Sequence, residues 1–107
     1  MVLASVFVLA GCSDSPRDVA VKWANAIADG DSKKVAEYST ERSFFTNAGL
    51  LAEVHSSERN MRQFKEEFIK EKLKKGEVEI DGDSASIGGK LKLKKVDGKW
   101  KVDADRL

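Results

Sequence analysis

The residue best suited to covalent chemistry is Cys12, the only cysteine of the chain. It follows Leu9, Ala10 and Gly11, at the end of a largely apolar segment, residues 2–10. A membrane-crossing helix needs about 20 residues, whereas the apolar part of a secretory signal needs about 7–15 and ends in small side chains. The small residues before the cysteine leave the backbone accessible to a peptidase. We therefore expect export of the chain and a cut immediately before Cys12.

Leu9-Ala10-Gly11-Cys12 resembles the lipobox of bacterial lipoprotein signals, in which an aliphatic residue and two small residues precede a cysteine. The resemblance implies transfer of a diacylglyceryl group to the Cys12 thiol and cleavage between Gly11 and Cys12. Acylation of the new amino group often follows. Stable anchoring of a protein takes at least two acyl chains, and this chemistry would supply two or three.

This interpretation divides the chain into a signal peptide (residues 1–11), a lipidated tether (12–15) and one domain (16–107). An export signal opens with cationic residues, but the first one here is Arg17, so we expect the natural start to lie upstream of Met1. The alternative is that the apolar segment is a buried strand or helix and that the cysteine is an ordinary core thiol.

The resemblance also bears on localisation in the cell envelope. In Gram-negative lipoproteins, an aspartate directly after the cysteine favours the inner membrane. Here Ser13 takes that place and Asp14 comes one position later. We therefore expect anchoring in the outer membrane, facing the periplasm, if the organism is Gram-negative; the rule does not extend to Gram-positive bacteria.

Composition argues against several other function classes. The chain has 19 basic and 18 acidic residues, a net charge of +1, which argues against a general nucleic-acid binder. One histidine and one lipidated cysteine cannot form a zinc site, and no disulfide can form within the chain. The sequence contains no phosphate-binding glycine loop and no spaced set of nucleophile and base. We expect neither a metal nor a cofactor.

Three further features could carry chemistry, and each has a plainer explanation. His55 is the only side chain that titrates near neutral pH, but it stands just before a predicted helix, where an exposed loop residue is expected. Tyr38 ends a short predicted helix and is typical of an aromatic at the edge of a core. Asp81-Gly82-Asp83 superficially suggests calcium, but a calcium loop needs several more oxygen ligands. We predict a turn there.

A row of lysines is the main predicted surface feature. If the C-terminal region forms a sheet, one of its faces carries Lys90, Lys92, Lys94, Lys99 and Lys101. A cationic face near a bilayer would attract anionic head groups, lipopolysaccharide phosphates or an acidic envelope protein. The alternative is that the lysines only solvate and protect the outward face of the sheet.

Helical periodicity and capping signals predict the N-terminal elements. Ser15 and Pro16 form a strong helix start, and Asp29-Gly30 a helix end. The middle of the chain predicts only a short or broken helix, because Asn47 and a nearby glycine weaken the pattern. The predicted helical segments are residues 16–29, 33–38, part of 40–56, and 58 to about 75.

After Gly76 the apolar period changes from 3.6 to 2, which predicts an antiparallel meander. Turns are expected at Asp81-Gly82 and Asp97-Gly98, and Gly88-Gly89 predicts a bend within one long strand. Three strands are therefore expected.

The second turn fixes the register by pairing Val96 with Lys99. Counting outward aligns Leu93 with Val102 and Leu91 with Ala104, so that apolar residues face each other. The same count predicts the pairs Lys92–Asp103, Lys90–Asp105, Lys94–Lys101 and Lys95–Trp100.

These elements predict an α+β fold, with N-terminal helices and one long helix packed on a C-terminal antiparallel meander. The segments at residues 26–31 and 35–38 and the hairpin at residues 97–102 resemble nuclear transport factor 2-like domains, and in particular small bacterial lipoproteins of unknown function with that fold. The resemblance implies a cone-shaped cavity. Four aromatic residues would line such a cavity or fill the core of a small domain: Trp23, Phe64, Phe68 and Trp100.

Our leading hypothesis is a lipid-anchored envelope protein whose domain binds or scaffolds another envelope component without catalysis. The rival is a small-ligand carrier or enzyme that uses the cavity. A pocket joining His55 or Tyr38 to a buried acid would favour the rival, and a filled core would favour scaffolding. An inhibitor or immunity protein at the cell surface is a third alternative.

Overall fold

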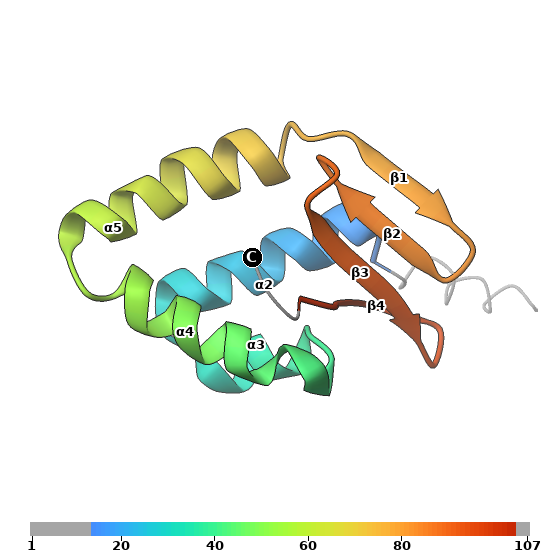
Figure 1. Ribbon diagram of the computed structural model, residues 1–107, viewed down its shortest axis with the longest axis horizontal. Helices are drawn as coiled ribbons and strands as arrows, with labels where there is room; N and C mark the ends of the chain where they lie inside the picture. Colours follow the sequence, from blue (N-terminus) through green and yellow to red (C-terminus); the bar gives the residue numbers. More distant parts are fainter. Residues whose placement is uncertain (1–13, 105–107) are drawn as a thin grey trace, which may run out of the picture.

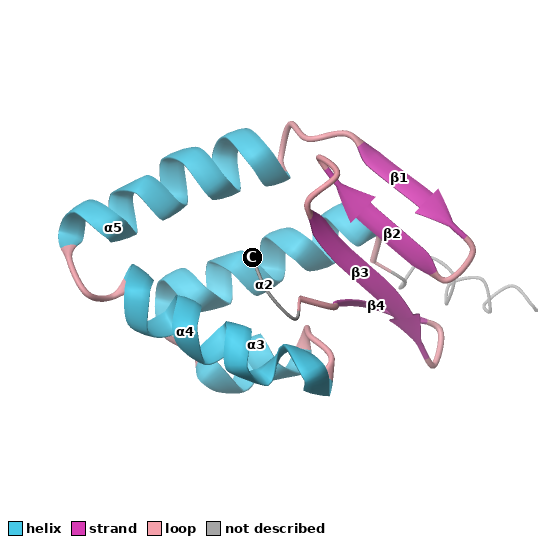
Figure 2. Ribbon diagram, viewed as in Figure 1, coloured by secondary structure: helices cyan, strands magenta, loops and turns pink. Residues whose placement is uncertain are grey.

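The computed structural model describes residues 14–104, so the predicted signal, the cleavage site and Cys12 lie outside the described residues. The chain forms helices first and strands last, as Figures 1 and 2 show. The helical elements are α2 (Pro16–Asp29), α3 (Ser32–Glu37), the 3₁₀ turn η1 (Glu41–Ser43), α4 (Phe44–Val54), α5 (Glu58–Gln63) and the π-helical segment η2 (Phe64–Leu73). The α+β class is confirmed. No helix among the described residues is long and apolar enough to cross a membrane.

Helix α2 forms where the sequence predicts it and lies at the centre of the fold. Ser15 Oγ accepts the Asp18 N–H, the Asp18 carboxylate accepts the Ser15 N–H, and Pro16 occupies the first turn. Gly30 ends the helix at φ 72°, a left-handed conformation that favours glycine. Trp23 and Ile27 are fully buried, and α2 contacts α3, α4, η2 and the sheet.

The long helix predicted after Ser57 is continuous but changes its winding. Ser57 caps α5 by accepting the Asn60 N–H, and from Phe64 onward the backbone is wound as a π-helix. At its end the Lys74 N–H donates to the Ile69 carbonyl, five residues back. The wider turn fits the apolar spacing, because Phe64, Ile69 and Leu73 are all buried along it and η2 packs against α2.

The sheet has four antiparallel strands in the order β1-β2-β3-β4, which corrects the prediction of three. The strands are β1 (Val78–Asp81), β2 (Ser84–Ile87), β3 (Leu91–Val96) and β4 (Lys99–Val102). Gly88 and Gly89 both have positive φ and form a turn that splits the predicted long strand, with Ile87 opposite Leu91. The first hairpin pairs Asp81 with Ser84, so its two-residue loop is Gly82-Asp83, one residue later than predicted.

The register of the last hairpin is as predicted. Val96 pairs with Lys99, Leu93 with Val102, and Lys94 with Lys101. Lys95 lies over the Trp100 ring, 5.2 Å from its centroid, which confirms the predicted cation–π contact.

The predicted alignment continues past the last strand pair. The Asp103 N–H donates to the Lys92 carbonyl at 2.8 Å, so these two residues lie opposite each other as predicted. The Asp103 carboxylate itself pairs with the Arg42 guanidinium at 3.0 Å and accepts the Thr40 hydroxyl. Strand β4 ends at Val102, before the predicted Leu91–Ala104 contact, and Asp105 lies outside the described residues.

A buried polar network fastens α4 to α2 and β4. The indole Nε1 of Trp23 donates to Asn47 Oδ1 at 3.0 Å, and the Asn47 side-chain amide donates to Ser39 Oγ at 2.8 Å. Ser43 Oγ donates to the Val102 carbonyl and accepts the Ala104 N–H. These bonds explain why α4 is a helix of 11 residues despite its asparagine and glycine.

Candidate functional site

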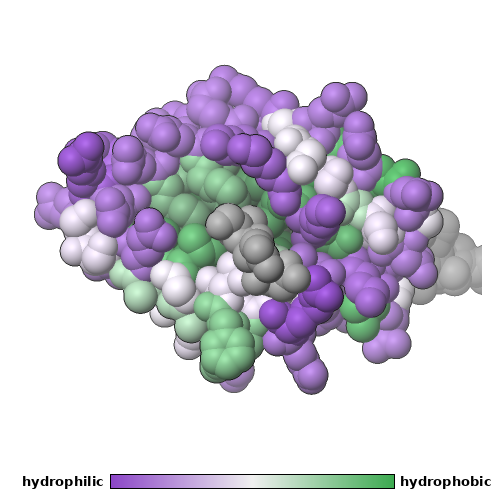
Figure 3. All heavy atoms as spheres, viewed as in Figure 1, coloured by the Kyte–Doolittle hydropathy of each residue, from purple (hydrophilic) through white to green (hydrophobic). Residues whose placement is uncertain are grey.

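An apolar groove opens between α4, η2 and the turn that joins β2 to β3. Figure 3 shows it as a hydrophobic hollow framed by hydrophilic side chains, facing the viewer between α4 and the upper helix. Its volume is about 710 Å³, within the range of about 300–1,000 Å³ typical of small-molecule sites. Its apolar wall is formed by Leu50, Phe64, Phe68, Leu73, Ile87 and Leu91.

The aromatic wall of the groove belongs to the core as well. Phe64 and Phe68 stack with their ring centroids 5.2 Å apart, and Phe68 meets Trp23 edge-on at 6.4 Å. Trp23 itself is fully buried, and Trp100 is 9% exposed under the sheet. The four aromatic residues therefore divide their roles: the two tryptophans fill the core, whereas the two phenylalanines also line the groove.

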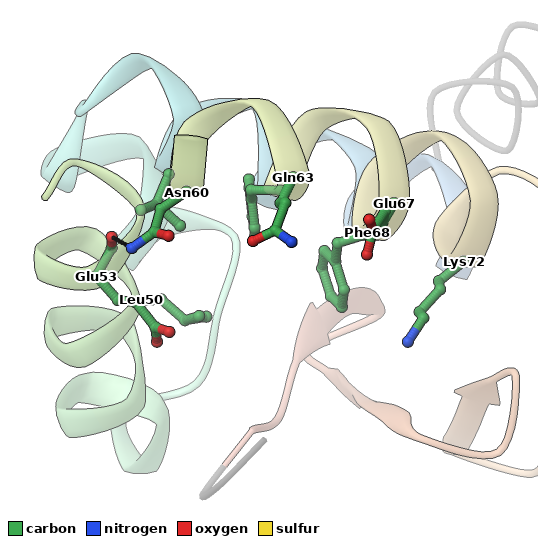
Figure 4. A pocket seen from close by; sticks show the side chains of 9 residues that line it. Leu50, Glu53, Asn60, Gln63, Glu67, Phe68 and Lys72 are labelled. Atoms are coloured by element: carbon green, nitrogen blue, oxygen red, sulfur yellow. Dashed lines mark hydrogen bonds between the residues drawn. The ribbon is translucent and has the colours of Figure 1, made fainter. Parts of the chain in front are cut away.

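The two ends of the groove differ in charge. At the sheet end, Lys72 from η2 and Lys90 from the β2–β3 turn line the apolar part. At the other end a smaller hollow of about 240 Å³ shares Leu50, Phe64, Phe68 and Lys72 with the main groove. Polar side chains also line this hollow, as Figure 4 shows: Glu53, Asn60 and Gln63 towards α4, and Glu67 beside Phe68.

Figure 4 also shows how these side chains lie. Leu50 projects from α4 towards the opposite helix, and Phe68 projects from η2 into the space between that helix and the sheet. Asn60 donates to the Glu53 carbonyl at 3.1 Å, which bridges α4 and α5 and closes the polar end. Lys72 reaches towards the sheet. The groove is thus polar at its helical end, apolar in its middle and cationic at its sheet end.

The predicted lysine face is present in part. Lys92, Lys94 and Lys99 are exposed, and Lys101 shares their face because it pairs with Lys94. Serines on β2 and acidic side chains on β1 continue this face, since Ser86 lies opposite both Lys92 and Glu79. The outer sheet face is therefore cationic on β3 and β4 and anionic on β1.

Two of the lysines have roles that the sequence did not predict. Lys90 does not belong to the row: it lies in the turn after Gly89 and lines the groove. Lys101 Nζ donates to the Glu37 carbonyl at 2.8 Å, which caps the end of α3.

His55 and Tyr38 lie outside the apolar groove. His55 is exposed at the end of α4, as predicted, and its Nε2–H donates to the Ile27 carbonyl at 2.8 Å, fastening α4 to the end of α2. Tyr38 ends α3, and its carbonyl accepts the Val102 N–H at the edge of the sheet. Asp81, Gly82 and Asp83 belong to the first hairpin. Within residues 14–104 no group of three or more potential metal ligands comes together.

The start of the domain is held in a defined place. Asp14 forms an ion pair with Lys22 at 2.9 Å, and this hydrogen-bonded carboxylate raises the pKa of Lys22. Arg17 donates to the carbonyls of Leu73 and Lys74 at 2.8 and 2.7 Å, which caps η2. The tether therefore enters the fold beside the end of η2, the helix that forms one wall of the groove.

Comparisons with protein-family models, curated proteins and solved structures give no match to this chain. The geometry of the chain itself must therefore support any functional proposal.

Proposed function

We propose that this chain is a lipid-anchored protein of the bacterial cell envelope, whose domain binds another envelope component without catalysing a reaction. The evidence for the lipid anchor is the sequence Leu9-Ala10-Gly11-Cys12, which follows an apolar segment. Acylation of Cys12 would place two or three acyl chains in the bilayer. In a Gram-negative organism the proposal places the protein in the outer membrane, facing the periplasm.

The described fold is compatible with such an anchor. From Ser13 to Ser15 the chain spans about 10 Å at most, so an acylated Cys12 would hold the domain close to the lipid surface. Arg17 and Asp14 fix the point at which the chain enters the domain. The nuclear transport factor 2-like assignment is part of the same proposal, supported by helices packed on one face of an antiparallel sheet.

Binding is favoured over catalysis by the composition of the groove. Its apolar part is lined by aliphatic and aromatic side chains and two lysines, and the two candidate acid–base residues, His55 and Tyr38, lie elsewhere. The exposed lysines of β3 and β4, which are Lys92, Lys94 and Lys99, would add attraction to anionic lipid head groups or to an acidic envelope protein.

Intact mass measurement tests the anchor. The chain is expressed in a bacterium, with any upstream start codon restored, beside a Cys12→Ser variant. We expect the first protein to lack residues 1–11 and to carry the mass of two or three acyl chains, and the variant to carry none. A main species that retains Met1 and carries no lipid would refute the proposal.

A further inference from the structure

We propose that the groove binds a single acyl chain that ends in an anionic head group, with the tail on the apolar wall and the head between Lys72 and Lys90. This inference rests on the proposed envelope location, because acylated anions occur there. It is an inference about this groove, and it requires neither Cys12 nor the lysines of the outer sheet face.

The shape and lining of the groove argue for an acyl tail. The wall combines Leu50 and Phe68, both half-buried, with the deeply buried Leu73 and Leu91. The groove is open to the surface, and its volume of about 710 Å³ lies within the range of small-ligand sites. An apolar surface of this kind, hollowed and rimmed by polar groups, is typical of a binding site.

The distribution of charge argues for an anionic head and fixes its orientation. Lys72 and Lys90 both line the apolar part of the groove, and they come from different elements, η2 and the β2–β3 turn. The carboxylate of Glu53 lies at the opposite, helical end, whereas that of Glu67 lies beside Phe68, between Glu53 and Lys72. An anion is therefore attracted to the sheet end and repelled from the helical end. A cationic amphiphile would have the reverse preference.

The test uses the full chain carrying Cys12→Ser, so that no acyl group on the protein itself competes for the groove. Laurate is titrated calorimetrically at monomeric concentrations, beside decanoate, dodecyl phosphate and dodecyltrimethylammonium. We expect laurate to bind and decanoate to bind about tenfold more weakly, because two fewer methylenes are buried. Dodecyl phosphate is expected to bind as well, and the two anions distinguish a fatty acid from a phospholipid-type head. The cation is expected to bind much more weakly.

Matched variants locate the binding. Replacing both groove lysines by glutamate, Lys72→Glu with Lys90→Glu, is expected to weaken laurate binding about tenfold. The same change at Lys94 and Lys99, on the outer sheet face, is expected to leave the affinity for laurate unchanged. Leu50→Glu, which places a carboxylate in the apolar wall, should weaken it far more than Phe45→Glu, whose side chain is 84% exposed on the same helix.

Several outcomes would overturn the inference. The first is that neither laurate nor dodecyl phosphate binds. The second is that dodecyltrimethylammonium binds as tightly as laurate. The third is that Leu50→Glu binds laurate as tightly as the unsubstituted chain and has the same unfolding curve. If laurate binds the Cys12→Ser chain but not the acylated one, the occupant is the protein's own acyl chain instead. Failure here leaves the anchoring proposal untouched, because that proposal depends on the mass of the mature chain.

Discussion

Replacing Asn47 by alanine tests the buried polar network that holds α4, and with it one wall of the groove. Trp23 is fully buried, and its indole N–H has Asn47 Oδ1 as its acceptor at 3.0 Å. Truncation leaves this donor without a partner, which costs about 1–3 kcal/mol. It also removes the bond to Ser39 Oγ, worth about 0.5–1.5 kcal/mol net, although Ser39 still donates to the Val35 carbonyl.

Together these losses lower the free energy of unfolding by about 2–4 kcal/mol. For a domain of this size each kcal/mol lowers the melting temperature by about 4–8 °C, so a fall of roughly 10–30 °C is expected. The assay is thermal and urea unfolding of the full chain carrying Cys12→Ser, followed by circular dichroism. Far-UV spectra at low temperature show whether the variant still folds.

The matched control is Asn60→Ala, the same truncation at a site whose bonds to the Glu53 carbonyl and Ser56 Oγ are exposed to solvent. It is expected to cost less than about 1 kcal/mol, because water replaces the lost partners. The reasoning is refuted if Asn47→Ala costs no more than Asn60→Ala, since the buried donor would then carry no penalty.

Two further predictions concern backbone and surface. Gly49→Ala is expected to raise the free energy of unfolding by about 0.4–1 kcal/mol, because Gly49 has a negative φ and nothing lies within 4 Å of the added methyl group. Gly82→Ala, at φ 63°, is expected to lower it. Urea titration of the two variants measures both changes. Changing Lys92, Lys94 and Lys101 to serine is expected to weaken binding of the Cys12→Ser chain to phosphatidylglycerol vesicles, most clearly at low salt. Unchanged sedimentation with the vesicles would mean that these lysines only solvate the sheet.

Elements set by local signals could be predicted from the sequence. Helix α2 begins and ends where Ser15, Pro16 and Gly30 place it, because caps act within a few residues of the chain. The register of the last hairpin follows from Asp97-Gly98 for the same reason, since a two-residue loop leaves only one pairing.

The turn at Gly88-Gly89 could not be predicted, because two structures share one pattern. Ile87 pairs with Leu91 across a loop of residues 88–90, and a loop of this length keeps odd-numbered residues on the inner face. A straight strand with a bend would do the same. Only the pairing of β2 with β3 decides between them, and that pairing moves Lys90 from the predicted lysine row to the groove.

Helix α4 shows the other limit of local patterns. Phe44 and Phe45, at its start, are 64% and 84% exposed, in edge-to-face contact with each other. The helix is held in place by Asn47, whose side chain is the buried hydrogen-bond acceptor of the Trp23 indole. In the sequence pattern the same asparagine weakened the helix prediction. That bond joins residues 24 positions apart, so no signal near Asn47 could have revealed it.

The open groove links ligand binding to the stability of this small domain. A domain of about 100 residues has a total stability of only about 5–15 kcal/mol, and here some apolar surface remains uncovered at Leu50, Phe68 and the exposed Phe45. A ligand present at 100 times its dissociation constant adds about 2.7 kcal/mol to the folded state, which is as large as the loss expected for Asn47→Ala. Occupancy of the groove would therefore change how firmly α4 and η2 are held together, because both form its walls. Because residues 14–104 leave this apolar surface uncovered among themselves, a ligand that fits there would add to the stability of the folded state.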